Sequence, residues 1–127
     1  MRTVVCFRAG DNDYAVPVEQ VREVRAGEAL QPLPSARPGV VGVLTVGESA
    51  LTVIAPLGAG GHHVLLLDRE AGIFGLQVDA VTGVADVDDV APAPPGQDHQ
   101  LIDGVCTVDQ RMTMLVNVEC LGERLDS

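Results

Sequence analysis

The chain has 127 residues and a formal net charge of -10, with 18 acidic and 8 basic residues. Its length suits a single domain over residues 1–127 and is too short for two ordinary domains. The acidic balance, without any basic run, argues against nucleic acid and anionic membrane as partners. No apolar run approaches the roughly 20 residues that span a bilayer, so we expect a cytoplasmic protein without membrane insertion.

Valine, leucine, isoleucine and alanine must fill the core, because aromatic residues are only 2% of the chain. The abundance of β-branched residues favours strands over helices. The three cysteines, Cys6, Cys106 and Cys120, are odd in number and far apart in the sequence. We interpret them as small core residues without a metal or redox role.

The N-terminal half predicts short strands joined by turns and loops. The predicted strands cover residues 4–9, 14–16, 40–46 and 51–54. Val18, Val21 and Val24 recur every three residues among charged neighbours, which indicates an amphipathic helical turn. Such a ridge either packs on the barrel or contacts a partner. Three prolines in residues 27–39 predict an irregular loop, and residues 55–63 predict a glycine-rich connector.

The centre of the chain predicts one long hairpin. An apolar strand over residues 64–67 and a longer one over residues 73–84 flank a turn at residues 68–72. The longer strand is apolar through most of its length, so we expect it to be mostly buried. We also expect it to bend at Asp79 before it resumes.

The C-terminal part predicts a last hairpin over residues 101–108 and 112–118, followed by a short helix over residues 119–125. In total about nine or ten short strands are expected, at spacings typical of a barrel or sandwich. The predicted fold class is therefore all-β. No internal repeat is visible in the sequence.

No pattern in the sequence indicates catalysis or metal binding. His62 and His63 lack the Cys-x-x-Cys or His-Glu-x-x-His partners of a zinc site. Asp86, Asp88 and Asp89 lack the glycine and glutamate of a calcium loop, so we interpret them as a solvated strand exit. We therefore expect a binding module without catalytic activity, cofactor or metal, whose exposed apolar ridges contact partners.

A set of sequence blocks covers nearly the whole chain in one order. The blocks are residues 10–18, 21–24, 32–34, 39–43, 75–84, 101–105 and 111–121, with Phe7 before the first. This set resembles the CheW family of bacterial chemotaxis coupling proteins. The resemblance implies two five-stranded SH3-like β-barrel subdomains that share one apolar core, with a short C-terminal helix and no catalytic activity.

The resemblance also implies partners and a binding site. Members of that family join the cytoplasmic tips of chemoreceptors to the regulatory domain of the CheA histidine kinase, or to a sister CheW-like protein, in arrays at the inner face of the membrane. The implied receptor groove lies between the two subdomains. The residues expected in or beside it are Val18, Val21, Glu23, Val24, Gly75, Val81 and Val84.

Two departures from the family pattern concern the expected kinase-facing region. Gly47 and Glu48 replace the arginine and glycine of the family's Asn-Leu-Arg-Gly block, and Ala55 replaces a later aspartate. Glycine cannot mimic the five donors of arginine, so an ion pair of that arginine with Glu23 is absent. The connector before Val64 is also shorter. We hypothesise a divergent coupler that keeps receptor binding and binds the kinase weakly or not at all.

A second hypothesis comes from a different class of protein. A stand-alone β-barrel sensory domain would hold a small molecule in the groove between the subdomains, and ligand-dependent thermal stability would favour it. The near absence of aromatic residues argues against this hypothesis, because small-molecule pockets usually use aromatic rings.

Overall fold

The computed structural model describes residues 2–26, 30–32, 40–57, 61–93 and 101–123, and these residues are mostly in β-strands. The predicted all-β class is therefore confirmed. The elements are β1 Arg2–Ala9, β2 Asn12–Pro17, the 3-10 turn η1 Val18–Gln20, β3 Val21–Ala26, β4 Gln31–Pro32, β5 Val40–Val46, β6 Ser49–Ile54, β7 His63–Arg69, β8 Gly72–Val78, β9 Ala80–Val87, β10 Ile102–Val108, β11 Arg111–Val116 and α1 Val118–Gly122.

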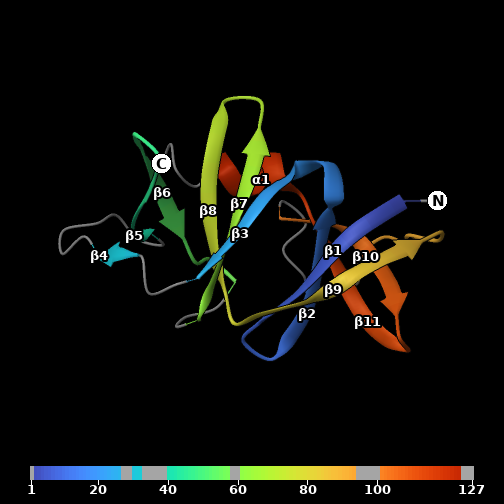
Figure 1. Ribbon diagram of the computed structural model, residues 1–127. Coiled ribbons are helices and arrows are strands. Elements are labelled where there is room, and N and C mark those ends of the chain that lie inside the picture. The colour runs from blue at the N-terminus through green and yellow to red at the C-terminus, as the bar shows by residue number, and fades with distance from the viewer. Residues whose placement is uncertain (1, 27–29, 33–39, 58–60, 94–100, 124–127) are drawn as a thin grey trace.

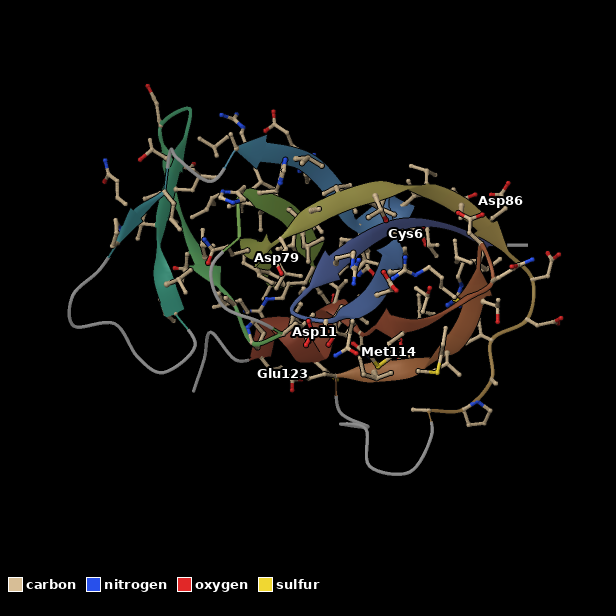
Figure 2. The ribbon with its side chains drawn as sticks, turned by 90° about the horizontal axis from the view of Figure 1, so that it is seen from below. Cys6, Asp11, Asp79, Asp86, Met114 and Glu123 are labelled. Carbon is tan, nitrogen blue, oxygen red and sulfur yellow. The ribbon has the colours of Figure 1, made fainter. Side chains whose placement is uncertain are left out.

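The strands form two sheets that lie side by side, with α1 behind β7 and β8 (Figure 1). One sheet has the order β9-β1-β2-β11-β10 and the other has the order β3-β7-β8-β6-β5-β4. The chain passes from the six-stranded to the five-stranded sheet between β8 and β9, at Asp79. The expected bend at Asp79 is thus confirmed, and Figure 2 shows Asp79 and Asp86 at the two ends of β9.

The two sheets repeat one pairing pattern, although the sequence shows no repeat. Read from β9 and from β3, both sheets pair antiparallel, antiparallel, parallel and antiparallel. The last edge also corresponds, because β4 pairs with β5 while Ala91 pairs with Val105 of β10. A glycine permits each close approach: a Cβ on Gly42 would overlap the carbonyl of Gln31, and one on Gly104 would lie 2.5 Å from the carbonyl oxygen of Ala91.

The main core lies between the sheets and takes buried side chains from both, as the predicted shared core requires. Its largest fully buried members are Phe7, Ile54, Leu65, Leu67, Phe74, Leu76 and Leu121. Leu121 comes from α1, whose first turn is capped by the Asn117 side chain accepting a hydrogen bond from the Cys120 backbone N–H at 3.0 Å. Each sheet also has a smaller cluster of its own, one around Cys6 and Cys106 and one around Leu44.

Three local predictions are wrong. The single, mostly buried strand predicted over residues 73–84 is β8 followed by β9 in the other sheet, and β9 is exposed at residues 82–84. The helical turn predicted through Val24 ends at Gln20, and Val21–Ala26 is the strand β3. Gln31–Pro32 forms the edge strand β4 inside the loop predicted to be irregular, because a sheet edge tolerates a proline that donates no ladder hydrogen bond. The rest of that loop, the middle of the glycine-rich connector and the end of the terminal helix lie outside the described residues.

Candidate functional site

The edge strand β3 carries two of the predicted contact residues on one face because of a β-bulge. Arg22 is an extra residue in its ladder with β7. The bulge places Val21 and Val24 on the same face, opposite Leu67 and Leu65 of the main core. The three-residue spacing that indicated a helix is therefore the spacing of a bulged strand.

The edge strand β9 repeats this arrangement at the corresponding position of the other sheet. Thr82 is the extra residue in its ladder with β1. Val81 and Val84 consequently share a face, opposite Phe7 and Val5 of the main core. Both edge strands thus carry a Val-x-x-Val segment with a bulge inside it, and both present its valines toward the core between the sheets.

In each strand the first valine is anchored and the second is exposed. Val21 and Val81 are half-buried against the main core, whereas Val24 is 43% and Val84 66% exposed. Val18 of η1 adds a further exposed valine at 38%. In Figure 1 both strands lie on the near side of the molecule, and in Figure 2 both run along its upper side. We call these five valines the valine rim.

The two halves of the valine rim differ in charge. On β3, the Arg25 Nε donates to the Glu23 carboxylate at 2.8 Å, and Arg22 lies 3.3 Å from the Asp68 carboxylate. Glu23 is exposed, and its cationic partner is Arg25 of its own strand. On β9 the corresponding positions are uncharged, and Gly83 adopts a φ of +153° that side chains rarely adopt. The β3 half is framed by ion pairs and the β9 half is not.

Gly75, expected in or beside the groove, lies inside the six-stranded sheet. It is buried in β8, and a Cβ there would lie 2.8 Å from a Val53 methyl carbon and 2.9 Å from a Val64 methyl carbon. Both valines belong to the smaller cluster around Leu44. Gly75 therefore shapes the packing of the cluster around Leu44 and offers no exposed side chain to a partner.

Asp79 fixes the start of β9, a role that the sequence analysis missed. Its backbone N–H donates to the Arg8 carbonyl at 2.9 Å, and its carboxylate accepts from the Gly10 N–H at 2.8 Å. Gly10 has a φ of +62° in the turn between β1 and β2. An aspartate between two apolar strand segments signals a bend, but its partner across 69 residues is not visible in the sequence.

The residues of the expected kinase-facing region lie around the hairpin of β5 and β6. Gly47 and Glu48 form the two-residue turn between Val46 and Ser49, and Ala55 is half-buried directly after β6. Gly47 has a φ of +61°, which glycine accepts and an arginine would adopt only with strain. The turn geometry is therefore matched to the glycine that this chain carries.

A hollow of about 210 Å³ opens beside β9 in the five-stranded sheet, lined in part by Cys6, Asp13 and Arg111. The Asp13 carboxylate accepts from Arg111 at 2.9 Å and lies 3.5 Å from Arg8. Burial raises the pKa of the Cys6 thiol, and electrostatic interaction with Cys106, Asp109 and Asp13 raises it further. Burial likewise raises the pKa of Cys106. Cys6 and Cys106 are buried, as predicted for core cysteines, whereas Cys120 is only half-buried.

Within the described ranges, no cluster of three or more His, Cys, Asp or Glu side chains is arranged to hold a metal ion. In the same part of the chain, no helix is long and apolar enough to cross a membrane.

The chain resembles known proteins along nearly its whole length. Residues 3–125 match the family model of the CheW-like domain. A probable chemotaxis protein CheW from Rhizobium etli is 26% identical over 140 residues, covering 99% of this chain and 90% of that protein. The chemotaxis protein CheW from Rhizobium meliloti is 28% identical over 132 residues, covering 93% of this chain and 85% of that protein.

A solved structure has the same fold. The crystal structure of the scaffolding protein TtCheW from Thermoanaerobacter tengcongensis matches with a TM-score of 0.83 at 21% identity, covering 92% of this chain and 84% of that chain. The match confirms the predicted pair of SH3-like subdomains with a short C-terminal helix. The second sheet here has six strands rather than the expected five, because β4 is added at its edge.

Proposed function

This chain belongs to the CheW-like family, and from that premise we propose that it is a non-catalytic chemotaxis scaffold that binds chemoreceptor cytoplasmic tips through the valine rim. One observation carries the proposal: two corresponding edge strands, one from each subdomain, expose valines toward the core that the subdomains share. Exposed apolar side chains gathered at one place mark protein-binding surfaces. The proposed location is the cytoplasmic receptor array.

The valine rim suits an apolar ridge of a receptor. Val21 and Val81 pack on the main core, and each edge strand is paired along one side, so Val24 and Val84 project from an ordered backbone. A partner that covers both exposed valines removes apolar surface from water with little ordering cost on this side of the interface. Glu23 and the ion pairs around it would then set the polar margin of the contact.

The proposal includes weak or absent binding of a CheA-type kinase regulatory domain, so that this chain acts as an accessory coupler beside a sister CheW-like protein. The Gly47 turn leaves no place for an arginine without strain. In addition, the alignment with the Rhizobium etli relative spans 140 residues, so that relative carries residues that this 127-residue chain lacks. We take both features as reasons to expect weaker kinase binding.

Paired titration calorimetry tests the proposal. The full chain is titrated separately with a cognate receptor tip fragment and with the kinase regulatory domain. We expect receptor binding that weakens at least tenfold in the Val24→Ser/Val84→Ser double variant, since losing central apolar contacts costs about 2 kcal/mol or more. The matched control is Val90→Ser, because Val90 is a similarly exposed valine outside the valine rim.

Three results would contradict parts of the proposal. Equal receptor affinity of the double variant and the control would remove the valine rim as the receptor site. Kinase binding as tight as that of an ordinary coupler would remove the accessory role. Binding to neither partner would favour the small-molecule alternative. That alternative places its ligand between the subdomains, whereas the hollow beside β9, of about 210 Å³, is lined by residues of the five-stranded sheet and the turn that joins β10 to β11.

A further inference from the structure

A second hollow, of about 480 Å³, lies on the five-stranded sheet away from the valine rim. It is bounded by the segment Asp88 to Ala91, by Val105 to Thr107 of β10, and by Met112 of β11. Two of its walls are exposed apolar side chains, since Met112 is 56% and Val90 40% exposed. We call this site the Met112 hollow. The valine rim uses none of its residues.

Met112 is the uncovered end of a stripe of core residues. Met112, Met114 and Val116 alternate along β11 and therefore share a face. Met114 and Val116 are buried in the main core, while Met112 extends the same face into solvent. Figure 2 shows Met114 on this last hairpin. A strand face that is covered at two positions and bare at the third offers a partner an apolar anchor point.

Two carboxylates border the apolar walls. Asp88 and Asp89 both line the hollow and are exposed. Among the described residues neither forms an ion pair with a basic side chain, including Arg2, whose backbone pairs with Val87 next to Asp88. Two carboxylates against this one nearby arginine leave the border acidic, and the complementary partner is cationic.

The acidic border is fixed in place. The Ala91 N–H donates to the Val105 carbonyl and the Val105 N–H donates to the Ala91 carbonyl, both at 2.8 Å. The absence of a side chain at Gly104 allows this close approach. A Cβ there would lie 2.6 Å from a Val90 methyl carbon and would push the segment away from β10. The segment therefore docks on β10 as a short extra strand. A docking surface formed in advance costs little ordering when a partner binds.

We propose that the Met112 hollow binds a protein segment that presents one apolar side chain flanked by arginine or lysine. The apolar side chain lies between Val90 and Met112, and the cations face Asp88 and Asp89. A small molecule fits less well, because these walls are themselves exposed and small-molecule sites enclose most of the ligand. The proposal stands independently of receptor binding by the valine rim.

Methyl NMR of the full chain, labelled at the methionine methyl groups, tests this directly. The probe is the peptide acetyl-Gly-Arg-Arg-Leu-Arg-Arg-Gly-amide. We expect a saturable shift of the Met112 signal, while Met114, which is 3% exposed, serves as an internal reference in the same spectrum. Alanine in place of the peptide leucine should weaken binding about tenfold. Added salt should weaken it too, because exposed charges are screened.

Protein variants locate the contact. Met112→Gln should weaken peptide binding about tenfold, and Asp88→Asn/Asp89→Asn should weaken it and flatten its salt dependence. Val84→Ser on the valine rim should leave it unchanged. The proposal is overturned if the alanine peptide binds equally well, if Val84→Ser weakens binding as much as Met112→Gln does, or if Met112 does not respond. A Met112 signal that shifts with protein concentration alone would assign the hollow to a second copy of this chain instead.

Discussion

The strands β3 and β9 occupy corresponding edges of the two sheets, and both expose valines, but with different residues around the bulge. Each is the edge strand next to the shared core, and each uses one bulge to turn two valines to one face. Around the β3 bulge stand Arg22 and Glu23, both in ion pairs. Around the β9 bulge stand Thr82 and Gly83, which carry no charge.

This difference in charge separates two contributions to binding, namely apolar binding energy and selectivity for the partner. The more exposed valine, Val84, follows the uncharged bulge of β9, where it can approach a partner without desolvating an ion pair. Val24 lies between charged neighbours, where contacts are more dependent on the partner's own charges. We infer that β9 supplies most of the apolar binding energy and that β3 supplies most of the selectivity.

The largest expected effect comes from overpacking the six-stranded sheet alone, at Gly75. Gly75→Val would place a branched side chain where a single Cβ already lies under 3 Å from Val53 and Val64. We expect a loss of about 3 kcal/mol in the free energy of unfolding. Hydrogen exchange should accelerate in the six-stranded sheet before the other. Chemical denaturation measures the loss, and Thr45→Val, an exposed change in the same sheet, should alter stability by less than about 0.5 kcal/mol.

The next largest effect is a difference in receptor affinity between variants of the two halves of the valine rim. Val84→Ser should weaken receptor binding about tenfold, whereas Val24→Ser should weaken it only about threefold, because Val24 has less exposed surface to bury. Calorimetry on the two single variants measures both. Equal losses would show that the smaller exposed surface of Val24 does not reduce its contribution, and a larger loss for Val24→Ser would reverse the assignment of roles.

A smaller effect concerns the link between the sheets. Asp79→Ala removes the acceptor of the Gly10 N–H and should cost about 1 kcal/mol of folding stability, since the freed N–H is exposed to water. Asp86→Ala at the other end of β9 is the control. It loses only an exposed bond from the Thr3 hydroxyl, and we expect a smaller cost. If both variants lose the same stability, Asp79 has no special role at the bend.

The smallest effect concerns the ion pair on β3. Glu23→Gln should change the free energy of unfolding by less than about 0.5 kcal/mol, because both side chains of the Glu23 and Arg25 pair are well exposed. The same variant should alter the salt dependence of receptor binding. A clear stability loss without any change in salt dependence would mean that this pair serves folding rather than recognition.

Much of the fold was predictable because most strands have a local sequence signal. Alternating apolar runs and turn residues located nearly all strands, and the bend at Asp79 was visible as a polar break in an apolar run. The bulges at Arg22 and Thr82 were not, because a bulge exists only relative to a partner strand. The regular spacing of Val18, Val21 and Val24 therefore indicated a helix where the chain forms a bulged strand.

The candidate site was predictable in part for the same reason. Valines on the edge strands stand out in the sequence, but the burial of Gly75 depends on side chains from β6 and β7. The Met112 hollow was missed altogether. It joins residues from β10, β11 and the segment after β9, and only the Ala91 bridge brings that segment onto β10. Asp88 and Asp89 alone indicated nothing more than a solvated strand exit.

One measurement tests most directly the central claim that β3 and β9 form a single receptor-binding surface. The full chain, labelled at the valine methyl groups, is titrated with the receptor tip fragment and followed by methyl NMR. We predict that the Val24 and Val84 signals shift together along one saturation curve, while buried Val53 stays in place. Shifts confined to one of the two strands, or absent from both, would contradict the account.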